Sequence, residues 1–425
     1  MKYLSVPKLE GTSRSGVQVP IMLFTRGGDD GILTAGWSVA ERIRRQKLMP
    51  DATAWDLLAI ALSVVAADGA TLRSSSPDGW TRQIDLEIAL YDPERWTPHA
   101  DALATALRFL TTDVWSISFR NGGILPSAPK KPRYPTHDAV ALLSGGLDSL
   151  IGAIDLTTAG KSLLAVSQTV RGDAAKQNRF AQRISGEIEH LQLNHNASTS
   201  RAQKETSQRS RSLIFLAFAV LAATTTQRYA YGKSVPLYVN ENGFIAINPP
   251  LTMARVGSLS TRTAHPDFLG RMQSIFDAVG LNVQIRNPYA EKTKGEMLRE
   301  CLNQDLLSVE APISTSCGRF QRFNYRHCGR CVPCQIRRAS FEAWGHPDPT
   351  DYVYDNLSIQ DQDHAAFDDV RSVAIALLTI EQNGLDRWLG PTLSSPFIHN
   401  RFALRNMLER GFSELRTIQE RYGLV

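Results

Sequence analysis

One short segment constrains the fold more than any other feature of this chain. It reads Val140-Ala-Leu-Leu-Ser-Gly-Gly-Leu-Asp148-Ser149, an apolar stretch that passes through a serine and two glycines into a helical pattern. Glycines let backbone amides approach an anion closely, and a helix N-terminus adds unpaired N–H groups and positive dipole. In an open parallel sheet such a turn lies at the carboxyl ends of the strands, where ligands bind. The segment predicts an anion site in an α/β fold.

The residues around this turn alternate between strand and helix patterns. Alternation of this kind indicates βαβ units and a doubly wound parallel sheet with helices on both faces. Thr293-Lys294-Gly295-Glu296 has capping-box spacing and predicts one further helix start. The predicted strands cover residues 137–143, 162–167, 235–240 and 283–286, and the predicted helices cover about 174–193, 204–226 and 266–279.

A proline-rich stretch over residues 121–136 separates this sheet from an N-terminal region. In that region residues 81–91 and 115–119 are predicted strands, and residues 56–67 are predicted to form an apolar helix opened by a capping residue. We expect an α+β accessory domain there, with no catalytic motif.

Helical periodicity returns near the C-terminus, over residues 369–382 and 402–422, and predicts a mainly helical tail packed on the core. The chain is therefore divided into an accessory domain, a sheet domain and a C-terminal extension, over residues 1–135, 136–345 and 346–425.

Composition excludes several classes of protein. A chain of 425 residues with 43% apolar and 21% charged residues is typical of a globular protein. Its net charge of +5 is small for this length and does not favour nucleic acid or a membrane surface. The most apolar run, residues 213–223, is too short to span a bilayer, and the N-terminus lacks the apolar region of a secretory signal. We expect a cytoplasmic protein that does not bind membranes.

Four of the five cysteines are clustered with the spacing C-x10-C-x2-C-x2-C. Four thiolates can surround one Zn²⁺ tetrahedrally, and a closed four-sulfur site is structural because no coordination position is open. An iron–sulfur cluster and reactive cysteines for sulfur transfer are the alternatives. The fifth, Cys301, is expected to be a small buried apolar residue. The four predicted zinc ligands are Cys317, Cys328, Cys331 and Cys334.

Residues 317–341 also hold six arginines and no acidic residue. The cluster is either a solvated basic face or a local positive field near a phosphate or carboxylate site.

The hexapeptide SGGLDS matches the PP-loop signature SGGxDS of ATP pyrophosphatases. Together with the later cysteine cluster it resembles the QueC family, the 7-cyano-7-deazaguanine synthases, over roughly residues 137–345. Arg211-x3-Phe215-Leu216 is similar to a helix start of that family, and Thr293-Lys294-Gly295-Glu296 and Cys328-Gly329-Arg330-Cys331 look like two further segments of it. The resemblance implies a PP-loop fold with structural Zn²⁺.

The resemblance also implies a reaction. Family enzymes use ATP with Mg²⁺ to adenylate the carboxylate of 7-carboxy-7-deazaguanine, and ammonia then attacks the activated acyl carbon on the way to a nitrile. By the same resemblance Lys294, Asp148 and Ser149 are catalytic, with Lys294 neutralising departing pyrophosphate. A helix-start lysine that is merely exposed is the alternative. The implied nucleotide-binding residues are Ser144, Gly145, Gly146, Leu147, Asp148, Ser149 and Arg211.

A guanine-like substrate needs groups that accept hydrogen bonds from its N–H groups. Glu241, directly after a predicted strand, is the candidate acceptor, with a surface turn as the alternative. Phe244 is a candidate for stacking on the ring or for core packing, and His265 a candidate for the site or for a structural role. The G-Y-P-D signature of the family is absent here, and Glu241-Asn242-Gly243-Phe244 takes its place.

This chain is also larger than the core of that family. Enlarged forms resemble proteins of bacterial anti-phage defence systems, including the Qat system, in which the acyl group is attached to an amine of a partner protein. We therefore expect a deazaguanine substrate and a protein partner encoded in a defence operon. The alternatives are housekeeping nitrile synthesis with ammonia and a PP-loop enzyme that modifies tRNA.

Overall fold

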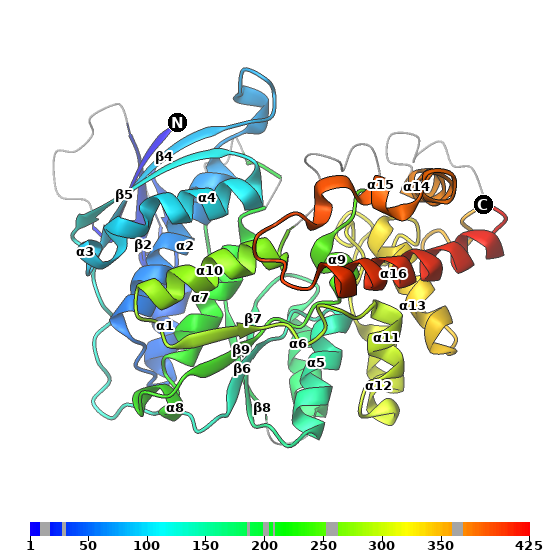
Figure 1. The fold of residues 1–425 in the computed structure, drawn as a ribbon. Coiled ribbons are helices and arrows are strands. Elements are labelled where there is room, and N and C mark those ends of the chain that lie inside the picture. Colours follow the sequence, from blue (N-terminus) through cyan, green and yellow to red (C-terminus); the bar gives the residue numbers. More distant parts are fainter. Residues whose placement is uncertain are drawn as a thin grey trace.

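The computed structural model describes residues 1–8, 18–27, 31–184, 188–198, 204–206, 209–251, 262–358 and 369–425. Two five-stranded sheets lie one above the other in Figure 1, with helices packed between them and the C-terminal helices to one side of the second sheet. The division of the chain at residues 135 and 345 stays a prediction.

The first sheet has the strand order β3-β2-β1-β4-β5, and every pair in it is parallel. The expected α+β domain is therefore wrong, because this region is a parallel α/β unit. The two predicted strands are present as β4 and β5. The class was wrong because alternate residues of β5 are exposed, and such alternation of polar and apolar residues is more typical of antiparallel sheets. The strands are β1 Lys2–Val6, β2 Val19–Leu23, β3 Leu33–Ala35, β4 Gln83–Leu90 and β5 Val114–Asn121.

The second sheet confirms the predicted parallel α/β sheet. Its order is β10-β9-β6-β7-β8, with the glycine turn directly after the central strand β6. One strand was mistaken for helix: α6 (Ala174–Arg183) ends well before residue 193, and β8 pairs with β7. The strands are β6 Ala139–Leu142, β7 Leu163–Gln168, β8 Ile188–Leu193, β9 Val235–Tyr238 and β10 Val283–Arg286.

Both faces of the second sheet are covered. Val140 and Leu164 pack into the core that contains α7 (Arg211–Ala223), whereas Ala165 on the opposite face packs with α5 (Leu147–Thr158) and α6. Helix α7 starts later than predicted, at Arg211. Its burial on all sides explains the long apolar run in the sequence.

Helix α2 (Ala52–Ala70) fills the space between the first sheet and α7. It begins four residues before the predicted start, because the side chain of Asp51, rather than a residue near Asp56, caps it by accepting a bond from Thr53 N at 2.8 Å. Among the described residues α2 is the only helix long and apolar enough to cross a membrane, yet 83% of its most apolar window is buried inside the protein. It is therefore a core helix.

The remaining helices of the first region are α1 Trp37–Arg45, α3 Pro93–Trp96 and α4 Ala100–Thr111. Helices α8 Gln227–Ala230, α9 Gly243–Ile247 and α10 Pro266–Ala278 connect strands of the second sheet. After β10 come α11 Lys294–Arg299, α12 Gln304–Glu310 and α13 Val332–Trp344.

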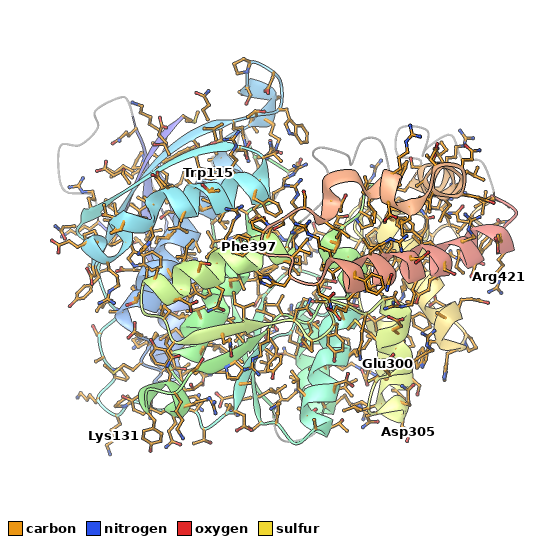
Figure 2. The ribbon with its side chains drawn as sticks, viewed as in Figure 1. Trp115, Lys131, Glu300, Asp305, Phe397 and Arg421 are labelled. Carbon is orange, nitrogen blue, oxygen red and sulfur yellow. The ribbon has the colours of Figure 1, made fainter. Side chains whose placement is uncertain are left out.

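The predicted helical tail is confirmed by α14 (Asp369–Asn383), α15 (Leu385–Leu389) and α16 (Arg401–Arg421). It folds back onto both α13 and α10. Phe397, which precedes α16, lies against Gly270 of α10, a position where any side chain would collide with the phenyl ring (Figure 2). The tail is thus part of the protein core and not an appendage.

Candidate active site

The glycine turn is held in one shape by its own serines. Gly145 adopts φ +87°, a conformation that favours glycine, and Gly146 caps α5. The Ser149 hydroxyl lies 3.0 Å from that of Ser144 and also donates to Gly146 O at 3.0 Å. These bonds fix the turn at the carboxyl edge of the sheet, next to the N-terminus of α5, where an anion is favoured.

A buried charge cluster stands beside the turn. Asp148, in the first turn of α5, accepts a bond from Lys294 Nζ at 2.5 Å and one from Asn242 Nδ2 at 2.7 Å. Glu241 precedes Asn242 in the loop after β9 and hydrogen-bonds to Asp148. The capping box predicted at Thr293 is present, so Lys294 starts α11. The structure thus brings together Asp148, Glu241 and Lys294 from three separate segments.

The pKa values of the two carboxyl groups in this cluster are shifted in opposite directions. Burial alone would raise the pKa of Asp148, but the Lys294 ammonium and the bonds from Glu241 and Asn242 outweigh burial and lower that pKa. Burial and the Asp148 charge raise the pKa of Glu241 well above its ordinary value. Of these two carboxyl groups, Glu241 therefore holds a proton more tightly than Asp148 does.

The start of α6 forms a second wall of the turn, which sequence reasoning missed. Gln177 Nε2 donates to Ser144 O at 3.2 Å. Lys176 Nζ lies 2.5 Å from Thr315 Oγ1 and 4.0 Å from the carboxylate of Asp173. Burial lowers the pKa of the Lys176 ammonium. The sequence offered only one sign that these residues belong to the site. They begin α6, the helix that follows β7, and β7 is the neighbour of β6 in the sheet.

The other predicted binding residues lie in different places. Arg211 is the first residue of α7, which packs on β6 and β7 and precedes β9, so it lies at the carboxyl edge of the sheet, the edge that carries the glycine turn. Phe244 is buried against Phe412 of α16, with ring centroids 5.2 Å apart, so it packs in the core, which was the alternative to stacking on a substrate ring. His265 caps α10, and burial lowers its pKa to about 4, so its imidazole is neutral. His265 also contacts Phe109 of the first region, 5.0 Å between ring centroids.

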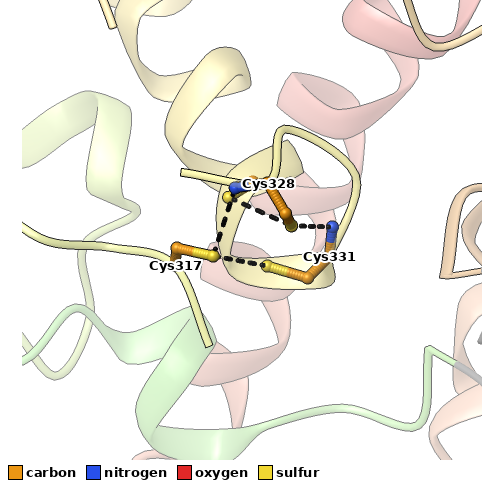
Figure 3. A group of neighbouring side chains, drawn as sticks. Cys317, Cys328 and Cys331 are labelled. Atoms are coloured by element: carbon orange, nitrogen blue, oxygen red, sulfur yellow. Dashed lines mark hydrogen bonds between the residues drawn. The ribbon is translucent and has the colours of Figure 1, made fainter. Parts of the chain in front are cut away.

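The four clustered cysteines meet at one point. All are buried, their sulfur atoms lie within 4.8 Å of one another, and none forms a disulfide. Two sulfur pairs are 3.9 Å apart, close to the roughly 3.8 Å that a tetrahedral site with Zn–S bonds of about 2.3 Å requires. Backbone N–H groups of Arg319 and Cys328 donate to the sulfur of Cys317, and Figure 3 shows the bond from Cys328. The donor set fits a structural metal such as zinc.

The arginines of this segment are only partly a solvated face. Arg330, Arg337 and Arg338 are buried, and the Arg337 guanidinium donates to Ala311 O and to the Ser314 hydroxyl, both at 2.9 Å. These side chains organise the loop around the cysteines.

The cysteine segment touches the glycine turn directly. Thr315 N donates to Gly145 O at 3.0 Å, and Thr315 pairs with Gly146 in a short parallel bridge. The hydroxyl of Thr315 also donates to Asp173 Oδ1 at 2.8 Å. Because Thr315 lies two residues before Cys317, a metal held by the cysteines would steady one side of the turn.

The tail braces the helix that carries Lys294. The Thr293 hydroxyl donates to Glu414 of α16 at 2.5 Å, and Arg410 of α16 pairs with Glu296. Burial raises the pKa of Glu414 to about 7. Neither residue belonged to any motif, because their role depends on the docking of α16.

Comparison with known proteins gives a consistent but partial match. No model of a known protein family matches the chain. The 7-cyano-7-deazaguanine synthase of Methanococcus aeolicus is 24% identical over 51% of this chain and 99% of that enzyme, and that of Ectopseudomonas mendocina is 27% identical over 50% and 97%. The synthase of Cupriavidus taiwanensis is 40% identical, but over only 17% of this chain and 30% of its own length. The chain is therefore similar to 7-cyano-7-deazaguanine synthases over about half its length.

We predict one zinc ion for each chain. Purified protein analysed for metal should contain close to one equivalent of zinc, and Cys328→Ser should reduce that content and lower the melting temperature, because an incomplete site binds metal weakly. Cys301→Ser, at a buried cysteine outside the cluster, should leave the zinc content unchanged. A visible absorption band from iron, or equal zinc in both variants, would contradict the assignment.

A pH effect on stability should arise from Glu414. Between pH 4.5 and 7 the folded chain holds a proton that the unfolded chain releases, so this contribution to stability is lost as the pH rises through that window. In the wild type the free energy of unfolding should fall by on the order of 2 kcal/mol between pH 5 and pH 8, as measured by urea unfolding. Glu414→Gln should abolish this fall. Glu409→Gln, an exposed residue of the same helix, serves as the control, and identical pH profiles for wild type and Glu414→Gln would refute the effect.

Proposed function

We propose that this chain uses ATP to activate a carboxylate of the 7-carboxy-7-deazaguanine type and passes the acyl group to an amine. The observation that carries the proposal is the glycine turn at the carboxyl edge of the second sheet, set beside the buried Asp148–Lys294 pair. The names of the relatives supply the substrate class.

Each group around the turn has a part in this proposal. The turn from Ser144 to Ser149 binds the β- and γ-phosphates through backbone amides and hydroxyls. Arg211 and Lys176 add positive charge on the α7 and α6 sides. Lys294 stabilises the charge that develops on departing pyrophosphate. Asp148, an ionised carboxylate, fits Mg²⁺, which binds one or two carboxylates together with phosphates and neutralises their charge.

The chemistry balances in two steps. A carboxylate oxygen of the substrate attacks the α-phosphorus, the bond to the bridging oxygen of the β-phosphate breaks, and pyrophosphate leaves. The amine nitrogen then attacks the acyl carbon, the acyl–oxygen bond breaks with its electrons going to AMP, and the amine releases a proton to water. Adenylation is needed because a carboxylate oxygen by itself is a poor leaving group.

Glu241 connects the phosphate cluster to the substrate in this proposal. Its protonated oxygen bonds to Asp148, and its carbonyl oxygen accepts an N–H group of the deazaguanine ring. For the amine, we favour a side chain of a protein partner in an anti-phage defence system, because this chain carries a first sheet and a tail besides the half that its relatives match. Nitrile synthesis with ammonia is the second candidate, and the name of the relatives favours it.

Product analysis distinguishes the two candidates. With ATP, Mg²⁺, 7-carboxy-7-deazaguanine and ammonia, we expect release of pyrophosphate and a reaction that stops either at the adenylate or, with release of AMP, at the amide, as resolved by mass spectrometry. Abundant nitrile would instead establish the housekeeping reaction. Absence of carboxylate-dependent pyrophosphate release, with Asp148→Asn as the inactive control, would overturn the activation chemistry itself.

The two lysines should have separable effects. Lys294→Met should lower kcat about 100-fold or more, because the charge it stabilises develops as pyrophosphate leaves. Lys176→Met should raise the Kd for ATP about tenfold, since Lys176 is less completely neutralised than Lys294, whose ammonium already contacts Asp148. Lys233→Met, at an exposed site far from the turn, is the control. A Lys176→Met enzyme with unchanged ATP affinity would remove Lys176 from the site.

A further inference from the structure

The two sheets have the same topology. When the strands of each sheet are numbered in chain order, both read 3-2-1-4-5: β3-β2-β1-β4-β5 in the first and β8-β7-β6-β9-β10 in the second. We call β1–β5 with α1–α4 the first unit, and β6–β10 with α5–α10 the second unit. Helix α2 precedes the fourth strand of the first unit as α7 does in the second, and α4 precedes the fifth strand as α10 does.

The units contact each other through these equivalent elements. Helix α2 packs on α7, and α4 packs on α10, as Figure 1 shows for the second pair. Helices α2 and α7 run antiparallel: the amide of Asp51 before α2 donates to Thr224 Oγ1 after α7, and Ser210 before α7 donates to Asp68 near the end of α2. Contacts between like elements in opposite directions define the interface of a two-fold dimer.

Among the described residues, the first unit has no counterpart of the elements that build the phosphate site in the second. Its first strand is followed in the sequence by Pro7-Lys8-Leu9-Glu10, where the second unit has Leu143-Ser144-Gly145-Gly146. Within the described residues no helix joins β1 to β2 or β2 to β3, whereas α5 and α6 make these connections in the second unit. At the carboxyl end of β2 the rings of Phe24 and Trp55 stack 4.7 Å apart, and Trp55 is 2% exposed. The described elements of the first unit therefore include its strands and the helices α2 and α4 that pack on the second unit.

We propose that the first unit is a non-catalytic copy of the second, takes the place of the second subunit of a two-fold dimer, and positions Arg211 for the nucleotide. The positioning role rests on the ATP chemistry proposed above, whereas the surrogate-subunit role does not.

One buried network carries the positioning. The Asp68 carboxylate accepts the Ser210 hydroxyl at 2.6 Å and Arg82 at 2.5 Å. Arg82 is fully buried and also pairs with Asp113 at 2.6 Å, so Asp68 cannot shift without breaking an internal ion pair. Ser210 precedes Arg211 directly. The first unit therefore fixes the end of α7 that lies at the carboxyl edge of the second sheet, the edge that carries the glycine turn, and Arg211 is the first residue of that end.

The test uses the full chain with a protease site inserted between Ser127 and Ala128, two exposed residues of the linker. After cleavage we expect both pieces to elute together at the volume of the uncut protein at micromolar concentration, and ATP to bind with a Kd within twofold of the uncut value. Separation of the pieces on cleavage would overturn the surrogate-subunit role, whether or not the protein binds ATP.

Two matched variants test the positioning. Ser210→Ala and Thr224→Ala each remove one hydroxyl from a contact between the units, at opposite ends of α7. Both should weaken association of the cleaved pieces, but only Ser210→Ala should raise the Kd for ATP, about fivefold, as expected for one buried hydrogen bond. Equal effects of the two variants on ATP affinity would refute the positioning role. If the uncut wild type failed to bind ATP, the proposed function would fail, and the association result would still decide the first role.

Discussion

The buried ion pair between Asp148 and Lys294 is the interaction on which the candidate site depends. It joins residues 146 positions apart in the chain and links the helix after the glycine turn to the helix after the last strand. An isolated charge at either position would be costly to bury, so each residue requires the other. The pair also sets the protonation of Glu241, since an ionised Asp148 disfavours a second negative charge beside it. Loop geometry, charge and proton position are thus coupled.

Three other parts of the chain contact the elements that surround this pair. The tail braces the helix of Lys294 through Glu414 and Arg410. The cysteine segment supports the glycine turn through Thr315. The first unit holds the start of α7 through Asp68. The tail and the first unit lie outside the resemblance to a known family, yet both contact elements that carry candidate site residues, and the size of the chain has a physical explanation in these contacts.

Features that depend on residues close together in the chain were predicted correctly. The capping box at Thr293 and the glycine turn at Ser144 form as expected because their bonds join residues within a few positions of one another. Strand β8 was missed because its polar residues have distant partners: His190 bonds to Ser167, and Gln192 bonds to Gln177. The first sheet was expected to belong to an α+β domain because its strands alternate polar and apolar residues. That alternation shows only that one face of a strand is exposed, whereas the direction of neighbouring strands is set by the connections between them.

The sequence by itself determined the kinds of chemistry available: an anion-binding turn, a lysine at a capped helix start and four thiols spaced for one metal. Each depends on residues close in the chain, where geometry is dictated by local backbone preferences. Only the tertiary structure decided which groups meet. It placed Lys294 on Asp148, added Lys176 to the wall of the turn, moved Phe244 into the core and paired two units of the same topology. Such meetings depend on how strands are ordered and helices packed, and nothing in a local pattern encodes contacts across more than a hundred residues.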